Sequence, residues 1–353
     1  MKIAFLLPSL DTKGPEVFTD NLIRGLMAEG CTCEVFYFND SFLPISFPVK
    51  CTKISFRKLY DFEGFDIVHT TMAKPDIYVA WHKKNIKAKW VSAIHCFMKE
   101  DLKQLRGSLK AALYSWLWIH ALRRAENIIV SSTPMLHYYE DLLCNVDVSW
   151  KIIPYGIPMK KIEEIDVATK EKLLNLKSQY TVLVGCGLLI KRKGFYQLIN
   201  YLQHNEKVAV VLIGDGECKE ELVAQAKRLD LSDRVLFLGF RLNSINYYSY
   251  FDVYCMSSNS EGFGLAMLEA MSLGMPLVCS DLDIYKDYFS PEDIALFQFG
   301  NQDSFNQAVD KVLSNKEQYA QNSLRLFNEN FSLESMAKKH LNFYNINLSE
   351  SSC

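Results

Sequence analysis

Residues 181–216 read TVLVGCGLLIKRKGFYQLINYLQHNEKVAVVLIGDG, and this stretch decides the fold class. Two continuous apolar runs, Thr181–Gly185 and Val208–Ile213, flank a segment in which apolar residues recur with a helical period. Strands that are apolar at every position are buried on both faces, as in parallel sheets covered by helices. The stretch therefore predicts a strand, a crossover helix and a second, parallel strand.

The same alternation continues in both directions along the chain, and two such series in one chain predict an α/β protein with two doubly wound Rossmann-like domains that face each other across a cleft. The strands expected outside the opening stretch are Ile3–Leu7, Cys33–Phe38, Ile67–His69, Trp90–His95, Asn127–Val130, Lys151–Ile153, Val235–Leu238, Val253–Met256, Leu277–Cys279 and Ala295–Phe297.

The chain length of 353 residues also fits two domains of roughly 100–200 residues each. The run Pro154–Pro158 has two prolines and a glycine, which bar regular structure and mark a boundary. We expect an N-terminal domain over residues 1–160 and a second domain over residues 161–331. Residues 332–353 would add a final helix, Leu333–Tyr344, that packs back on the first domain.

Composition excludes several classes of protein. Hydrophobic residues make up 49% of the chain, too many for a disordered protein, and the net charge of −2 argues against a nucleic-acid binder. The ten cysteines are scattered without a Cys-x-x-Cys pair, so neither a zinc site nor a disulfide framework is expected, and a cytoplasmic protein is predicted. The sequence shows no secretory signal and no run long enough to span a membrane, so we expect a soluble or peripheral protein.

The near-neutral total hides an uneven distribution of charge. Residues 83–124 contain ten Lys and Arg against two acidic residues, and they are interleaved with aromatic side chains such as Trp90, Trp116 and Trp118. Such a basic amphipathic stretch predicts peripheral binding to an anionic membrane surface. The alternative is an ordinary solvated helix face with an aromatic stripe that faces the core.

The most informative motif is residues 257–276, SSNSEGFGLAMLEAMSLGMP. A strand runs into a polar loop and then into a helix from about Gly264 to Gly274, so glycine backbone and a helix N-terminus are open to an anion such as a diphosphate. On a helical path Glu261 and Glu269 would stand ~12 Å apart. That exceeds the spacing of about 5–9.5 Å in a hydrolytic carboxylate pair, so the two carboxylates are expected to meet different parts of one long ligand.

With its glycines and Gly-x-Pro, this Glu-x7-Glu motif resembles the signature of retaining GT-B glycosyltransferases of family GT4, also called glycosyltransferase group 1. The resemblance implies that Glu269 binds the donor ribose. It implies that Glu261 and His95, the catalytic residues, grip the transferred sugar. The backbone of Gly262, Phe263, Gly264 and Leu265 would meet the diphosphate.

Other blocks resemble the same family in the same order. Residues 187–195, GLLIKRKGF, resemble its Gly-Arg-Leu…Lys-Gly segment, with Leu188 where an arginine is common. By resemblance Arg192 and Lys193 lie by the donor diphosphate, where a guanidinium can fork to two oxygens. Near the first strand, Pro15 removes a backbone donor, so only Gly14 carries over from the family's Gly-Gly. The remaining donor-site positions implied are Gly216, near the nucleotide, and Phe240 and Arg241, beside the nucleobase.

The resemblance implies retaining transfer of a sugar from a nucleotide-diphospho-sugar, expected to be a UDP-sugar, to a glycan or lipid-linked acceptor. The pathway implied is bacterial surface polysaccharide synthesis, such as lipopolysaccharide, O-antigen or capsule. No cofactor is expected, because the nucleotide-sugar is a co-substrate. No metal is expected, because Arg192, Lys193 and the amides of residues 262–265 would supply the charge at the departing phosphate. Two alternatives stay open: transfer to a small soluble acceptor, and a non-catalytic nucleotide-sugar-binding scaffold.

Overall fold

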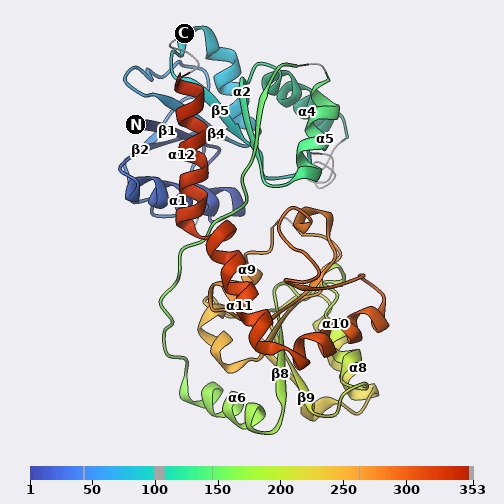
Figure 1. Cartoon of the computed structure of the whole chain (residues 1–353). Coiled ribbons are helices and arrows are strands. Elements are labelled where there is room, and N and C mark those ends of the chain that lie inside the picture. Colours follow the sequence, from blue (N-terminus) through green and yellow to red (C-terminus); the bar gives the residue numbers. More distant parts are fainter. Residues whose placement is uncertain (43, 99–107, 145, 262, 350–353) are drawn as a thin grey trace. The chain divides into compact units, whose positions relative to one another are not determined.

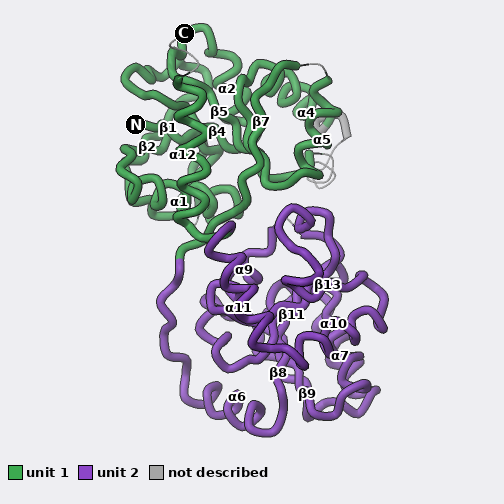
Figure 2. The backbone as a smooth tube through the Cα atoms, viewed as in Figure 1, with its two compact units in different colours: residues 1–158, 331–353 green, residues 159–330 purple. Residues whose placement is uncertain are grey.

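A computed structural model describes residues 1–42, 44–98, 108–144, 146–261 and 263–349. The chain forms two compact units (Figure 2). Unit 1 comprises residues 1–158 and 331–353, and unit 2 comprises residues 159–330. Unit 1 is therefore built from both ends of the chain.

Unit 1 contains a seven-stranded sheet in the order β3-β2-β1-β4-β5-β6-β7, and every neighbouring pair is parallel. The chain order reverses between β1 and β4, and such a switch point leaves a crevice at the carboxyl ends of the two strands. The strands are β1 (Lys2–Leu7), β2 (Thr32–Tyr37), β3 (Cys51–Lys53), β4 (Ile67–Thr71), β5 (Lys89–Ala93), β6 (Asn127–Val130) and β7 (Ser149–Ile152).

Two strands differ from the sequence-based expectation. The sequence does not predict β3, because this three-residue edge strand is largely exposed and lacks an apolar run. β5 ends at Ala93, so His95 lies in the loop just beyond the strand rather than at its last position. Both differences concern strand ends and edges, where pairing partners decide the extent of a strand.

Helices cover the sheet of unit 1, and the last helix of the chain lies beside the first (Figure 1). The contact needs a small residue, since a Cβ on Gly25 would come within 2.8 Å of the Ala337 Cβ. The Tyr344 hydroxyl also lies 2.7 Å from Nδ1 of buried His69. The helices are α1 (Gly14–Ala28), α2 (Ala73–His82), α4 (Ser108–Leu122), α5 (Thr133–Leu143) and α12 (Leu333–Ser349).

Unit 2 repeats the plan with six parallel strands in the order β10-β9-β8-β11-β12-β13. Its switch point lies between β8 and β11. The strands are β8 (Thr181–Cys186), β9 (Val208–Ile213), β10 (Val235–Gly239), β11 (Val253–Met256), β12 (Leu277–Ser280) and β13 (Ala295–Phe297). The helices are α6 (Val167–Gln179), α7 (Tyr196–Tyr201), α8 (Lys219–Arg228), α9 (Leu265–Ser272), α10 (Gln302–Ser314) and α11 (Lys316–Leu326).

The apolar patterns explain this arrangement. Every residue of β9 is buried, as expected for a central strand covered by helices on both faces. The close packing of Phe195 on β8 requires a glycine at position 185, because a Cβ there would come within 2.7 Å of the Phe195 ring. The expected doubly wound topology of both halves is therefore confirmed.

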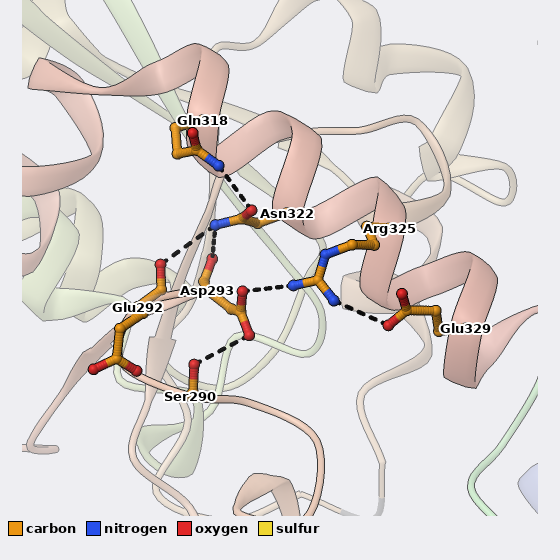
Figure 3. Close-up of polar contacts among 7 residues, drawn as sticks. All are labelled: Ser290, Glu292, Asp293, Gln318, Asn322, Arg325 and Glu329. Atoms are coloured by element: carbon orange, nitrogen blue, oxygen red, sulfur yellow. Dashed lines mark hydrogen bonds and ion pairs between the residues drawn. The ribbon is translucent and has the colours of Figure 1, made fainter.

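A polar network fastens α11 to the loop before β13 (Figure 3). Asn322 donates to the main-chain oxygens of Glu292 and Asp293. Arg325 forms an ion pair of 2.6 Å with Asp293 and another of 3.0 Å with Glu329. Because α11 packs against α9, the network supports the helix that contains Glu269. The remaining members of the network are Ser290 and Gln318.

Candidate functional site

A cavity of about 250 Å³ lies in unit 2 at the carboxyl ends of β8 and β11. This is the switch point of the sheet, the position where doubly wound folds bind ligands. The cavity is bounded by the ends of the two strands, the loop after β11 and the first turn of α9. Its lining includes Cys186, Gly187, Lys193, Tyr254, Met256, Ser257, Ser258, Glu261, Gly264 and Leu265.

The first turn of α9 opens into this cavity. Gly264 has a φ of +78°, which an L side chain rarely adopts, and a Cβ there would come within 2.8 Å of the Tyr285 hydroxyl. The glycine lets the chain turn from the loop into the helix, whose N-terminal amides favour an anion. Phe263 has a different role, because its ring is buried beside Tyr285 and its carbonyl accepts a hydrogen bond from the Tyr285 hydroxyl. Gly262 lies outside the described residues.

Lys193 and Glu261 form an ion pair within the cavity. Lys193 Nζ lies 2.5 Å from Glu261 Oε1, and the side chains are 16% and 8% exposed. The Ser258 hydroxyl donates to the same oxygen at 2.5 Å. The sequence assigned Lys193 to the donor diphosphate and Glu261 to the sugar, and the structure brings these two side chains together. A charge buried to this extent needs a partner of opposite sign, and the two side chains supply it to each other.

The loop around residues 191–194 is fixed to the loop after β11. Gly194 has a φ of +63°, and a Cβ there would come within 2.2 Å of the Ser257 carbonyl oxygen. Arg192 donates from Nη1 to the Ser260 carbonyl at 2.5 Å, and its own carbonyl accepts from the Asn259 amide at 2.7 Å. Arg192 therefore connects the two loops, and the other N–H groups of its guanidinium are available to bind a ligand.

Glu269 lies one turn further along α9. Its side chain is 15% exposed, and Oε1 accepts a hydrogen bond of 2.6 Å from Lys160. Lys160 precedes α6 in the irregular segment that begins unit 2. No sequence motif indicates this partner, because the two residues are 109 positions apart.

Arg192, Phe263 and Glu269 lie beside the cavity without lining it, and three further expected donor-site residues of unit 2 do not line it either. Gly216 has a φ of +159° and packs on the Leu189 backbone, where a Cβ would come within 2.6 Å of an oxygen. Phe240 is 69% exposed on the loop after β10. The Arg241 guanidinium lies 5.8 Å from the centre of the Tyr247 ring. Their assignment to the nucleotide stays a prediction.

His95 belongs to unit 1 and is held by aromatic neighbours. Its Nδ1 lies 2.9 Å from the Tyr155 hydroxyl, and its ring lies 4.5 Å from that of Phe18. Burial lowers the pKa of His95 to about 3, with a smaller contribution from nearby His340. His95 is therefore a neutral imidazole at physiological pH. Its buried Nε2 has no hydrogen-bond partner among the described residues.

Sequence reasoning missed one carboxylate near Gly14. Glu16 follows β1 at the switch point of unit 1 and is 4% exposed. Burial raises the pKa of Glu16, and within the described part of the chain its Oε2 accepts no hydrogen bond. The only signal in the sequence was an acidic residue at the third position of a helix that begins Gly-Pro. Gly14 itself opens α1, and a Cβ there would meet nothing within 4 Å.

Two family profiles match the chain and between them cover most of it. The family described as Glycosyltransferase Family 4 matches residues 12–161, and the family described as Glycosyl transferases group 1 matches residues 166–324. The second match contains the cavity of unit 2 and all its lining residues.

Individual proteins agree with the profiles. The O-antigen biosynthesis glycosyltransferase WclY of Escherichia coli is 27% identical over 351 residues, 98% of either chain. The E. coli UDP-Gal:alpha-D-GlcNAc-diphosphoundecaprenol alpha-1,3-galactosyltransferase is 29% identical over 79% of this chain and 77% of its own. Among solved structures, Anabaena HepE in complex with UDP superposes over 100% of both chains with a TM-score of 0.76 at 18% identity. With two Rossmann-like units and both profile matches, the chain belongs to the glycosyltransferases of family 4 (group 1), which have the GT-B fold.

Proposed function

We propose that this glycosyltransferase transfers a sugar from a UDP-sugar to a lipid-linked glycan acceptor, with retention at the anomeric carbon, in the synthesis of a bacterial surface polysaccharide. The observation that supports it best is the Lys193–Glu261–Ser258 cluster beside the first turn of α9. The printed names of the relatives agree, because one is an O-antigen enzyme and another uses a diphosphoundecaprenol acceptor.

Each part of the cavity suits one part of such a donor. The diphosphate lies at the amides of Gly264 and Leu265, where Lys193 and Arg192 neutralise the charge that develops as the nucleoside diphosphate departs. These cations replace a metal ion in our proposal. Within the described ranges no group of three or more His, Cys, Asp or Glu side chains is placed to hold one.

Glu261 and His95 act on the transferred sugar. Glu261 pairs with Lys193, and its carboxylate oxygens can accept hydrogen bonds from sugar hydroxyls and stabilise positive charge at the anomeric centre. His95 is neutral because burial lowers its pKa to about 3, so it donates or accepts a hydrogen bond without adding a cation. No residue is assigned as a covalent nucleophile, since the donor phosphate is proposed to deprotonate the acceptor.

Unit 1 offers a surface for the membrane that would hold such an acceptor. Leu113, Trp116 and Leu117 of α4 are 59%, 53% and 38% exposed, and Trp81 of α2 is 73% exposed. Trp118 of the same helix is buried, and its indole N–H donates a hydrogen bond to Asp76. The aromatic and apolar residues of α4 therefore lie on two faces of the helix, one in the core and one exposed. Large apolar side chains in such numbers on one helix face mark an interaction surface.

A groove of about 880 Å³ runs along this surface between α2 and α4. Basic side chains of Lys83, Lys84 and Arg124 line it together with Trp81 and Leu117. We propose that the groove and its flanking described residues rest on anionic lipid at the cytoplasmic face of the membrane. Residues 99–107 of the predicted basic stretch lie outside the described residues. No helix in the described ranges is long and apolar enough to cross a bilayer.

Donor and acceptor assays test the enzymatic proposal. Hydrolysis of UDP-, GDP- and ADP-sugars identifies the donor, and GlcNAc-diphosphoundecaprenol serves as the first acceptor. NMR of the product reports the anomeric configuration, and EDTA tests metal independence. An inverted product would contradict retention, and activity lost in EDTA and restored by a divalent cation would contradict metal independence. No turnover of any donor would contradict the enzymatic proposal as a whole.

Vesicle co-sedimentation tests the membrane proposal. The protein should bind anionic phosphatidylglycerol vesicles and dissociate from them at high salt concentration. It should not bind neutral phosphatidylcholine vesicles. The double variant Lys84→Glu/Arg123→Glu changes one groove residue and the exposed neighbour of the groove residue Arg124, and it should lose binding. Trp116→Ser should weaken binding. The matched control Lys50→Glu/Arg57→Glu changes two exposed basic residues of unit 1 outside the groove. Equal loss of vesicle binding in both double variants would show that binding depends on net charge and not on the proposed surface.

A further inference from the structure

The segment of residues 159–166 begins unit 2 and contains no regular secondary structure (Figure 2). One of its side chains nevertheless reaches α9. Lys160 Nζ lies 2.6 Å from Glu269 Oε1, with the lysine side chain 44% exposed and the glutamate 15% exposed. The segment is also attached through Glu163, whose amide donates to the Asn246 side chain at 3.1 Å.

The surroundings of Glu269 make this lysine important. Tyr248 and Tyr254 are buried close by, and the pKa of each is raised well above its ordinary value, first by burial and to a smaller degree by nearby groups that include Glu269. Phenol rings solvate a carboxylate poorly. In the described part of the chain, Lys160 is the single cation in contact with Glu269. A mostly buried carboxylate without such a partner is costly.

We propose that Lys160 is a positioning residue of the donor site, which orients the Glu269 carboxylate for the ribose hydroxyls of the donor. The inference rests on the proposed function, because the donor ribose is the ligand assigned to Glu269. It adds the joining segment, residues 159–166, to the donor-binding machinery of unit 2.

Lysine and ribose can share the carboxylate. A carboxylate offers about four acceptor positions on two oxygens, and Lys160 uses one of them on Oε1. Oε2 accepts no hydrogen bond within the described residues and is left for the ribose. The ammonium has three donors, so Lys160 need not leave Glu269 when the donor binds. Donor affinity then depends on where the joining segment places residue 160.

Isothermal titration calorimetry, in which UDP is titrated into the whole chain, tests the inference. Lys160→Met should weaken UDP binding about 10-fold, in the range expected for one charge-assisted contact. Lys160→Arg should restore affinity to within about 3-fold of the wild type, because it keeps the charge. Lys161→Met is the matched control, since Lys161 is the exposed neighbour with no contact to Glu269, and it should bind UDP like the wild type.

Two further measurements separate positioning from a general effect. In a double-mutant cycle, Lys160→Met should weaken UDP binding little further once Glu269→Gln is present, because the lysine acts through that carboxylate. In donor hydrolysis, Lys160→Met should raise the donor KM and leave kcat within about 2-fold.

The inference is overturned if Lys160→Met binds UDP as well as or better than the wild type, if the two substitutions are additive, or if Lys161→Met loses as much affinity. In those cases the proposed function stands, provided that the wild type binds and Glu269→Gln weakens binding. If the wild type binds none of UDP, GDP and ADP, the proposed function fails and the inference fails with it.

Discussion

The ammonium of Lys193 and the carboxylate of Glu261 meet at 2.5 Å in the cavity of unit 2, although 68 residues separate them in the chain. Both side chains are mostly buried, so each charge is compensated by the other. In the proposed function, Lys193 meets the donor diphosphate and Glu261 meets the positive charge that develops on the sugar.

Removal of the Lys193 charge should affect both the compensation of the Glu261 charge and the binding of the donor diphosphate. Lys193→Met leaves Glu261 buried without its cation and removes a phosphate partner, so UDP affinity should fall about 30-fold or more. Lys191→Met, which changes an exposed neighbour on the same short loop, is the control. Calorimetric titration with UDP compares the two variants. Equal affinities for Lys193→Met and the wild type would remove Lys193 from the donor site.

His95→Ala should lower turnover and spare donor binding. The imidazole is proposed to contact the transferred sugar, so single-turnover rates should fall about 100-fold while UDP affinity stays within about 2-fold. Because the pKa of His95 is lowered to about 3, the rate of the wild type should show no titration of this group between pH 5 and 8. A rate that rises with an apparent pKa near 6.5 and loses that step in His95→Ala would contradict the neutral role.

Two glycine-to-alanine substitutions should lower the free energy of unfolding by clearly different amounts. Gly194→Ala adds a Cβ within 2.2 Å of the Ser257 oxygen at a φ of +63°, so the free energy of unfolding should drop by about 3 kcal/mol and UDP binding should weaken. Gly300→Ala has a φ of +80° but meets nothing within 4 Å, so only the backbone cost of about 1 kcal/mol applies. Urea denaturation of both variants measures the difference, and similar losses would refute the proposed close approach.

Acid should destabilise unit 1 through its buried histidines. Burial lowers the pKa of His340 to about 4, below the ordinary value of 6.5, so the unfolded chain binds more protons between these values. Stability attributable to neutral His340 is present above pH 6.5 and is lost as pH falls toward 4. Relative to His340→Gln, the wild type should therefore lose roughly 2 kcal/mol of unfolding free energy across that window. Urea denaturation of the two proteins at pH 7 and pH 4.5 measures the loss, and an equal change in both proteins would disprove it.

Much of the fold could be predicted because its signals are local. Val208–Ile213 is apolar at every position, and the structure buries all six of those residues in β9. The expected helix from Gly264 to Gly274 is α9, Leu265–Ser272. The edge strand β3 was not predictable, because Cys51–Lys53 pairs with β2 without an apolar pattern of its own.

The sequence predicts individual residues of the candidate site but not the contacts between them. Lys193 comes from one motif, and Glu261, Gly264 and Leu265 come from another; the structure places all four around one cavity. Glu16 escaped notice because a single acidic residue at a helix start has no distinguishing pattern. Its significance depends on burial, which no local window of sequence reports.

The sequence by itself determined the two doubly wound halves and the glycines at the cavity, because strand period, helix period and backbone freedom are properties of neighbouring residues. Only the tertiary structure decided which charges meet. Lys193 in the loop after β8 reaches Glu261 in the loop after β11 across 68 residues, and Lys160 reaches Glu269 across 109. The physical reason is that crossover connections bring the carboxyl ends of distant parallel strands to one edge, where side chains from unrelated parts of the chain become partners.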